Sequence, residues 1–75
     1  MGLIADSLRD LIAAFDNEQG MPEKAYYAAK EIIWHLLGED AAKVFVNNID
    51  ATDDCYYTNM RGDDLADKVF DAKDF

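Results

Sequence analysis

Two residues in this sequence could form a nucleophile and its base. Cys55 and His35 are the single cysteine and the single histidine of the 75-residue chain. A catalytic thiol needs a base within hydrogen-bond reach and a third group that orients that base. Twenty residues separate Cys55 from His35, and the sequence identifies no third group. We therefore predict that the protein is not an enzyme, has no catalytic residues, and carries Cys55 as an ordinary thiol.

Acidic oxygens cluster between Asp50 and Asp54, where they could ligate a calcium ion. An EF-hand loop, however, needs Gly at its sixth position and Glu at its twelfth. Counted from Asp50, those positions hold Cys55 and Arg61. One cysteine and one histidine are too few for a structural zinc site, and the four glycines form no phosphate-binding loop. The sequence therefore predicts neither a metal site nor a cofactor.

The charge balance excludes several classes of partner. Asp and Glu total 16 and Lys and Arg total 7, which gives a net charge of -9. Such a chain is repelled by nucleic-acid phosphates and by anionic lipid. A hydrophobic content of 51% excludes a disordered tail, and no apolar run approaches the roughly 20 residues of a membrane span. Charged residues soon after Met1 do not fit a secretory signal. We expect a cytoplasmic protein that binds neither nucleic acid nor membrane.

Hydrophobic spacing predicts four helical segments within one domain, residues 1–75. Apolar residues recur every three or four positions, which is typical of one face of a helix. The first predicted helix has an apolar face formed by residues between Ile4 and Phe15. The other three run over Pro22–Leu37, from Glu39 to about Ile49, and from Asp63 or Asp64 to about Ala72. In the third segment, Val44–Val46 is rich in strand-forming residues, so a short strand is the alternative there.

The ends of these helices have recognisable signals. Asp6 or Ser7 is expected to cap the first helix, and Gly20 to follow it in a left-handed conformation. Pro22 is expected in the first turn of the second helix, and Gly38 at its end. Turn-forming residues dominate 47–62, which predicts an ordered loop with at most one helical turn. The predicted fold is all-α, a compact bundle of three or four short helices with an ordered acidic loop.

Two aromatic residues lie off the main apolar face of the second helix. That face comprises Ala25, Tyr26, Ala29, Ile32, Ile33, Leu36 and Leu37. Tyr27 and Trp34 are seven residues apart and share another side of the helix with three charged residues, Glu23, Lys30 and Glu31. Exposed large aromatic residues often anchor protein interfaces. The alternative is a central helix that is buried on two sides.

Acidic residues dominate the C-terminal third of the chain. The eight that follow residue 49 are all aspartates: Asp50, Asp53, Asp54, Asp63, Asp64, Asp67, Asp71 and Asp74. Towards the C-terminus, Asp64, Asp67, Asp71 and Asp74 recur every three or four residues, which spaces them by ~5 Å along one helix face. That is sparser than duplex phosphate, with one charge per ~3.4 Å of each strand. Short aspartate side chains hold charge close to the backbone, as a rigid imitation of DNA phosphates requires. The alternative is a solvated face without a binding role.

A family resemblance bears on this acidic face. Residues 41–71 contain Phe45-Val46-Asn47-Asn48-Ile49, then Tyr57, then Gly62-Asp63-Asp64-Leu65-Ala66-Asp67. This stretch resembles the C-terminal part of ArdA-type antirestriction proteins. The resemblance implies an acidic, helical DNA mimic that occupies the DNA groove of a restriction enzyme. Other small bacteriophage DNA mimics, including some anti-CRISPR proteins, are similar in size, acidity and helicity.

Two functional hypotheses follow. The first is a phage or mobile-element inhibitor that acts in a bacterial host cell. Its partner would be a basic nucleic-acid-binding defence protein of the restriction or CRISPR type, bound through the eight aspartates. The second is a helical adaptor or dimerisation module that binds a protein through Tyr27 and Trp34. A core this small is also compatible with a homodimer.

Overall fold

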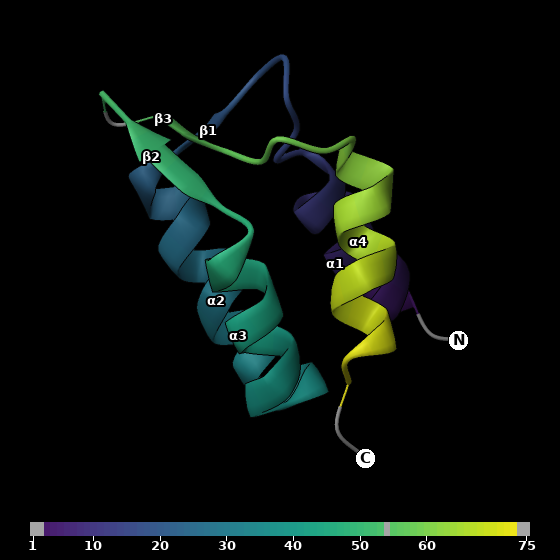
Figure 1. Ribbon diagram of the computed structural model, residues 1–75. Coiled ribbons are helices and arrows are strands. Elements are labelled where there is room, and N and C mark those ends of the chain that lie inside the picture. The colour runs from purple at the N-terminus through teal and green to yellow at the C-terminus, as the bar shows by residue number, and fades with distance from the viewer. Residues whose placement is uncertain (1–2, 54, 74–75) are drawn as a thin grey trace.

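The computed structural model describes residues 3–53 and 55–73 and contains four helices and three short strands there (Figure 1). The helices are α1 (Leu3–Ala13), α2 (Glu23–Leu37), α3 (Glu39–Asn47) and α4 (Gly62–Asp71). The strands are β1 (Met21–Pro22), β2 (Asp50–Thr52) and β3 (Cys55–Tyr57). The radius of gyration over Cα atoms is 11.1 Å, close to the value of about 11 Å expected for a compact chain of this length.

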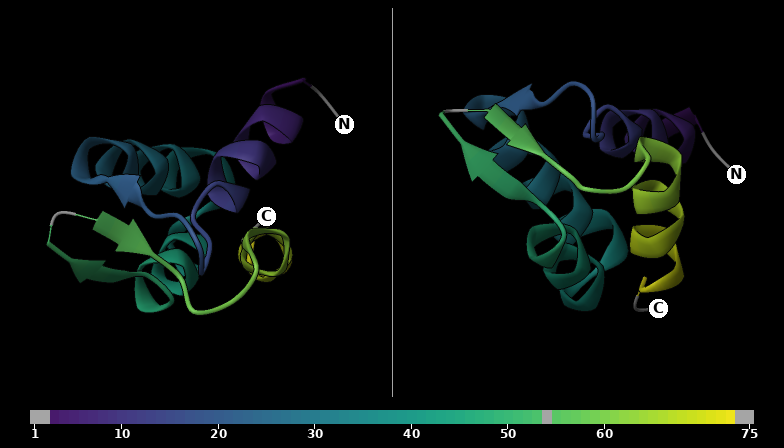
Figure 2. Two further views of the ribbon diagram at one scale, coloured as in Figure 1. Left: turned by 90° about the horizontal axis from the view of Figure 1, so that it is seen from above. Right: turned by 45° about the horizontal axis from the view of Figure 1, so that its top comes forward.

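The helices form two packed pairs. Helices α2 and α3 lie side by side, while α4 packs on both α1 and α3 (Figures 1 and 2). A single residue, Gly38, joins α2 to α3, with a φ of 101° that favours glycine. Its N–H donates to the carbonyl oxygens of Ile33 and Trp34 at 3.2 and 3.1 Å. The prediction that Gly38 ends the second helix is confirmed.

A small antiparallel sheet replaces much of the predicted loop. Its strand order is β1-β3-β2, and Tyr56 at its centre pairs with Ala51 on one side and Met21 on the other. Asp53, at the hairpin turn, has a φ of 49°, which short polar side chains tolerate. The fold is mostly helical, and the strictly all-α prediction is wrong because tertiary pairing forms strands too short to leave a period-two pattern.

One hydrophobic core joins the four helices. Its buried members are Leu8, Ile12, Phe15, Ala29, Ile33, Leu37, Ala41, Ala42, Phe45, Leu65, Ala66 and Val69. At its centre, Phe15 meets Phe45 edge to face with ring centroids 5.2 Å apart. Tyr26 stacks on Phe45 at 5.7 Å and on Tyr56 at 4.5 Å, which attaches the sheet to the helices. The prediction that Ile32 and Leu36 belong to the buried face is wrong, because both are exposed.

The starts of the first two helices differ from the prediction. Helix α1 begins at Leu3, so Asp6 and Ser7 lie inside it and do not cap it. The apolar spacing continues upstream of both residues, which is why a capping pattern could not locate the start. Helix α2 begins at Glu23, and Pro22 precedes it in an extended conformation instead of joining its first turn.

The connection after α1 is closed by a side chain and not by a glycine. One Asp16 carboxylate oxygen accepts hydrogen bonds from the backbone N–H groups of Glu18 and Gln19, at 3.0 and 2.6 Å. This turn does not need the left-handed glycine that was predicted at Gly20. Among the glycines of residues 3–53 and 55–73, a positive φ occurs at Gly38.

The last two helices also correct the predicted boundaries. Val44–Val46 is helical within α3, so the strand alternative is wrong. Arg61 occupies the N-cap of α4 in an extended conformation, so neither Asp63 nor Asp64 caps it. Both aspartates lie in its first turn, where negative charge is favourable.

Gly62 sets how closely α4 approaches α1. A Cβ atom at this position would overlap the carbonyl oxygen of Ala13 and lie 2.7 Å from its carbonyl carbon. Because these are backbone atoms, a side chain at Gly62 requires one helix to move. The helix pair that carries the acidic residues therefore depends on glycine at this junction.

Candidate functional site

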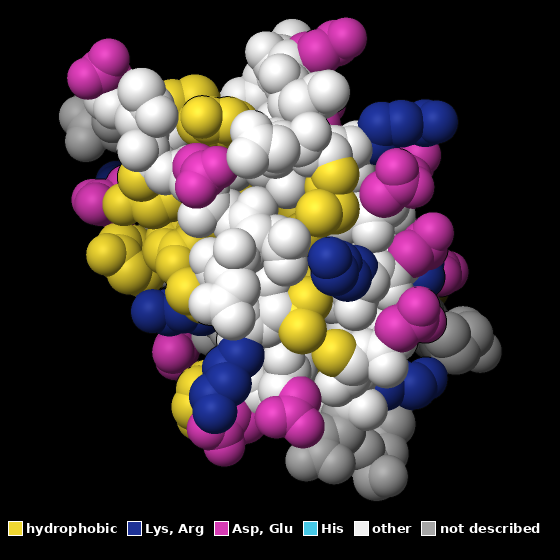
Figure 3. Space-filling view, viewed as in Figure 1, with side chains coloured by type: hydrophobic (Ala, Val, Ile, Leu, Met, Phe, Trp, Pro, Cys, Tyr) yellow, Lys and Arg dark blue, Asp and Glu magenta, His cyan; other side chains and the backbone are white. Residues whose placement is uncertain are grey.

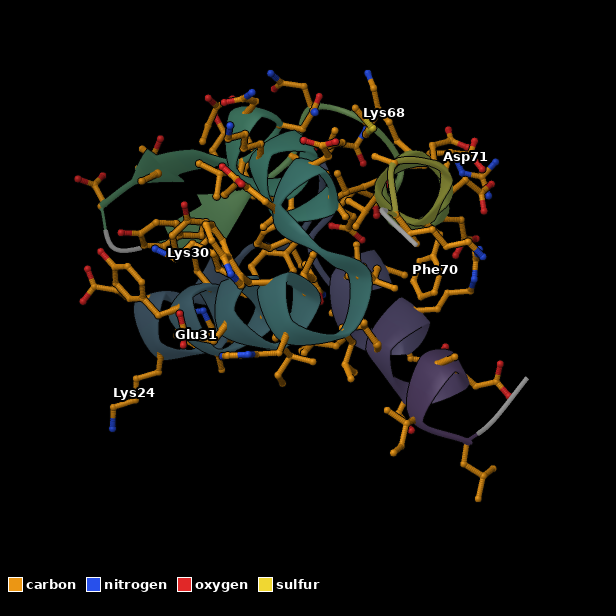
Figure 4. All side chains as sticks on the ribbon, turned by 90° about the horizontal axis from the view of Figure 1, so that it is seen from below. Lys24, Lys30, Glu31, Lys68, Phe70 and Asp71 are labelled. Carbon is orange, nitrogen blue, oxygen red and sulfur yellow. The ribbon has the colours of Figure 1, made fainter. Side chains whose placement is uncertain are left out.

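Helix α4 separates apolar and acidic residues completely. Leu65, Ala66 and Val69 are fully buried. The opposite side, named the acidic face below, is exposed and comprises Asp63, Asp64, Asp67 and Asp71. At ~100° per residue these four aspartates fall within an arc of about 100°. Acidic side chains line the α4 edge of the molecule in Figure 3, and Asp71 points outward from the helix in Figure 4.

Two of the protein's own arginines pair with aspartates of the acidic face. Arg9 of α1 reaches across to Asp67, with 2.5 Å between Nη1 and Oδ1. The guanidinium of Arg9 also lies 4.9 Å from the ring centroid of Phe70. The side chains of Arg61 and Asp63 form a longer ion pair at 3.8 Å. The carboxylates of Asp67 and Asp63 are therefore partly neutralised within the protein and attract a cationic partner less strongly.

Asp64 and Asp71 are the acidic residues of α4 most open to a partner. Within the described part of the chain, no hydrogen bond or ion pair engages either carboxylate. They lie seven residues apart on a rigid helix, or about 10 Å along its axis. Lys68 and Asp71 both project outward from this helix (Figure 4).

The remaining aspartates do not extend this surface. Asp50 and Asp53 belong to the β2–β3 hairpin, which lies on the opposite side of the molecule from α4 (Figures 1 and 2). Asp50 accepts a hydrogen bond from the Asn59 amide at 3.1 Å. Asp54 and Asp74 lie outside the described residues. The structure thus groups four of the eight predicted contacts and separates two others.

Tyr27 and Trp34 lie outside the buried face of α2, as predicted. Each side chain is 48% exposed, so neither is buried between two sides of the bundle. Lys30 lies one helical turn from both, and its ammonium is 4.9 Å from the Tyr27 ring centroid, within cation–π range. A shallow cavity of about 120 Å³ beside Trp34 is lined by Lys30, Trp34, Ala42, Lys43, Val46 and Asn47.

The aromatic pair has a charged neighbour from another helix that the sequence did not predict, in addition to the polar residues Lys30, Glu31 and His35 of α2. Lys43 of α3 comes beside Trp34 because Gly38 folds α3 back along α2. A hydrogen bond to Glu39, with Nζ and Oε2 3.0 Å apart, raises the pKa of Lys43, so the ammonium stays charged. Lys30 and Lys43 belong to separate predicted helices, so the sequence did not indicate that both line the cavity beside Trp34.

The thiol and the imidazole do not form a catalytic pair. Cys55 pairs with Pro22 in the sheet, at the residue that precedes α2. His35 lies 13 residues further along, which is ~20 Å of helix. Its Nε2 atom is 3.7 Å from Glu31 instead. No group of three or more potential metal ligands occurs in residues 3–53 and 55–73.

Comparisons with protein-family models, with curated proteins and with solved structures found no match to this chain. The resemblance to ArdA-type antirestriction proteins stays a prediction. The described helices include none that combines the length and the apolar character required to cross a membrane.

Proposed function

We propose that this chain is a non-enzymatic binding protein whose acidic face docks on a basic surface of a nucleic-acid-binding protein. In this proposal it acts inside a bacterial cell as a DNA-mimic inhibitor of a restriction or CRISPR-type defence system. One observation carries the proposal: α4 holds a row of exposed aspartates while its opposite face is fully buried. Charges fixed on a packed helix are pre-organised for a cationic partner.

The two open carboxylates are fixed on one side of a single helix. Asp64 and Asp71 are about 10 Å apart along α4, sparser than the charges of a DNA strand, which rise by ~3.4 Å each along the duplex axis, so the pair offers two anchoring points to a basic surface. Arg side chains that bind phosphates also bind carboxylates, because both anions accept two parallel hydrogen bonds from a guanidinium group. The net charge of -9 adds attraction at longer range.

The experiment is capture of a partner from a bacterial lysate on the immobilised protein, followed by affinity measurements at rising salt. Screened charge contacts predict a steep loss of affinity between low and high ionic strength. A nearly flat salt dependence would contradict binding through the acidic face.

The aromatic pair supports a second candidate function, an adaptor that binds its partner through an apolar surface. Half-exposed Tyr27 and Trp34 on one side of α2 are the observation in its favour. Apolar burial is not screened by salt, so this candidate predicts an affinity that changes little with ionic strength. Changing Tyr27 and Trp34 together to Ala removes this surface and leaves α4 intact.

A further inference from the structure

A third exposed surface lies between α1 and α2. We name it the apolar groove; it has a volume of about 260 Å³ and is lined by Leu3, Ile4, Ser7, Leu8, Leu11 and Ile32. Leu3 is 85% exposed and Ile4 is 68% exposed, the two highest values among the large hydrophobic side chains of the described residues. The N-terminal half of α1 extends past the other helices (Figure 4).

The groove has the shape of a helix-binding site. Its α1 residues recur at three- and four-residue steps along one side of the helix, and Ile32 of α2 forms the facing wall. Ser7 is the small residue in the middle of that row, which lets a docked backbone approach closely. A helix binds such a groove by inserting apolar side chains spaced three, four and seven residues apart.

The charges beside the groove select the occupant. Asp6 and Asp10 are exposed on α1, and at ~100° per residue they border the groove on its solvent side. The one cation of α1, Arg9, points the other way and is held by Asp67 of α4. The α1 border of the groove is therefore purely acidic.

This border disfavours a second copy of the chain as the occupant. An antiparallel pair of α1 helices would bring Asp6 and Asp10 against the same residues of the other copy. Two chains of net charge -9 would also repel each other at longer range. We propose instead that the groove docks a cationic amphipathic helix of a partner protein, with Lys or Arg beside its apolar stripe. This proposal uses no residue of the acidic face and does not depend on the function proposed above.

The test uses a fluorescent synthetic helix of about 18 residues, with Leu at helical spacing and Lys elsewhere. Binding to the full chain is followed by fluorescence anisotropy at near-physiological salt. One comparison peptide has the same composition in an order that breaks the apolar stripe, and another carries Glu in place of Lys. The patterned Leu/Lys peptide should bind at least tenfold more tightly than either comparison.

Protein variants locate the site. Leu3→Ser with Ile4→Ser should lower the affinity for the patterned peptide at least tenfold. Asp6→Asn with Asp10→Asn should lower this affinity several-fold. Asp64→Asn with Asp71→Asn should leave its affinity within about twofold, which keeps this test separate from the acidic face. Circular dichroism checks that each variant keeps its helices.

Three results would overturn the proposal. The first is equal affinity for the patterned peptide and for the peptide of the same composition without an apolar stripe, or for the Lys and Glu peptides. The second is an unchanged affinity in the Leu3→Ser and Ile4→Ser variant. The third is sedimentation of the unmodified chain as a dimer that this variant converts to monomer, because the occupant is then a second copy.

Discussion

Helices α1 and α4 pack against each other, yet only α1 exposes large apolar side chains to solvent. Both bury an apolar stripe, around Ile12 in α1 and around Val69 in α4. Outside that stripe, α1 exposes Leu3 and Ile4 together with two acidic residues, Asp6 and Asp10, whereas α4 exposes its row of aspartates. The inward faces of this pair determine the fold, and the outward faces determine what each helix can bind. An acidic helix face and an apolar groove with an acidic border suit two different contacts.

The largest expected effect comes from the junction of this pair. Gly62→Ala should lower the free energy of unfolding by about 2–3 kcal/mol, because the new methyl group overlaps the Ala13 backbone and overpacking of this kind forces helices apart. Urea unfolding followed by circular dichroism measures the loss.

The control for this junction is Asp63→Ala at the next, exposed position of α4. It should change the free energy of unfolding by less than about 0.5 kcal/mol. Equal unfolding midpoints for Gly62→Ala and Asp63→Ala would mean that the close approach of α4 to α1 is not needed for stability.

The next effect sharpens the contrast in binding. Asp64→Asn with Asp71→Asn should lower the affinity for the captured partner more than tenfold, or by over ~1.4 kcal/mol in binding free energy. Both side chains are exposed and lack an ion pair with any described residue, so stability should hardly change. Isothermal calorimetry measures the affinity.

The matched control removes two charges from the other side of the molecule. Asp50→Asn with Asp53→Asn alters the net charge equally and keeps the hydrogen bond to Asn59 and the left-handed turn, which Asn also tolerates. We expect less than a threefold loss of affinity. If both double variants weaken binding alike, net charge and not the acidic face controls recognition.

A smaller effect concerns the contact that links the two helices. Arg9→Gln and Asp67→Asn should each lower the free energy of unfolding by about 1 kcal/mol or less, because the ion pair is partly exposed. A double-mutant cycle should give a coupling of about 0.2–1 kcal/mol that shrinks at high salt. A coupling of zero would show that Arg9 acts through Phe70 alone.

The smallest effect is alkaline sensitivity at the aromatic stack. Burial, and then repulsion from Tyr27, raises the pKa of Tyr26 above its ordinary value of 10.0. Burial and the hydrogen bond to Glu23 raise the pKa of Tyr56. The folded state therefore holds these protons more tightly, so their stabilisation is complete below pH 10.0 and declines as pH rises through the raised pKa values.

Urea unfolding at a series of alkaline pH values tests this. The free energy of unfolding should fall above pH 10.0 and fall less in Tyr56→Phe, which cannot titrate. An identical decline in that variant would exclude Tyr56 as a contributor.

Helical periodicity was enough to predict most of this fold. All four helices were expected, and the end of α2 at Gly38 was correct. The same glycine signal failed at Gly20, because the Asp16 side chain closes the turn after α1. The sheet was missed because its strands have two or three residues and depend on pairing between β1 and β3, which are distant in sequence. The buried Thr58, in the same segment, likewise gave no pattern.

The candidate site was predicted only in part. Three-and-four spacing correctly placed the α4 aspartates on one exposed face, and the seven-residue spacing of Tyr27 and Trp34 correctly placed them outside the core. Spacing along one helix could not reveal that Arg9 from α1 forms an ion pair with Asp67, nor that Ile32 faces α1 across an apolar groove. Both facts depend on how separate helices pack.

The most direct test of the central claim is competition between this protein and duplex DNA for the captured partner. A fluorescent duplex is bound to the partner, and its release is followed as the unlabelled protein is added. Recognition through the acidic face predicts complete, stoichiometric release of the duplex by the native chain, with more than tenfold more of the Asp64→Asn and Asp71→Asn variant needed for the same effect. Formation of a ternary complex, with the duplex still bound at saturating protein, would contradict DNA mimicry.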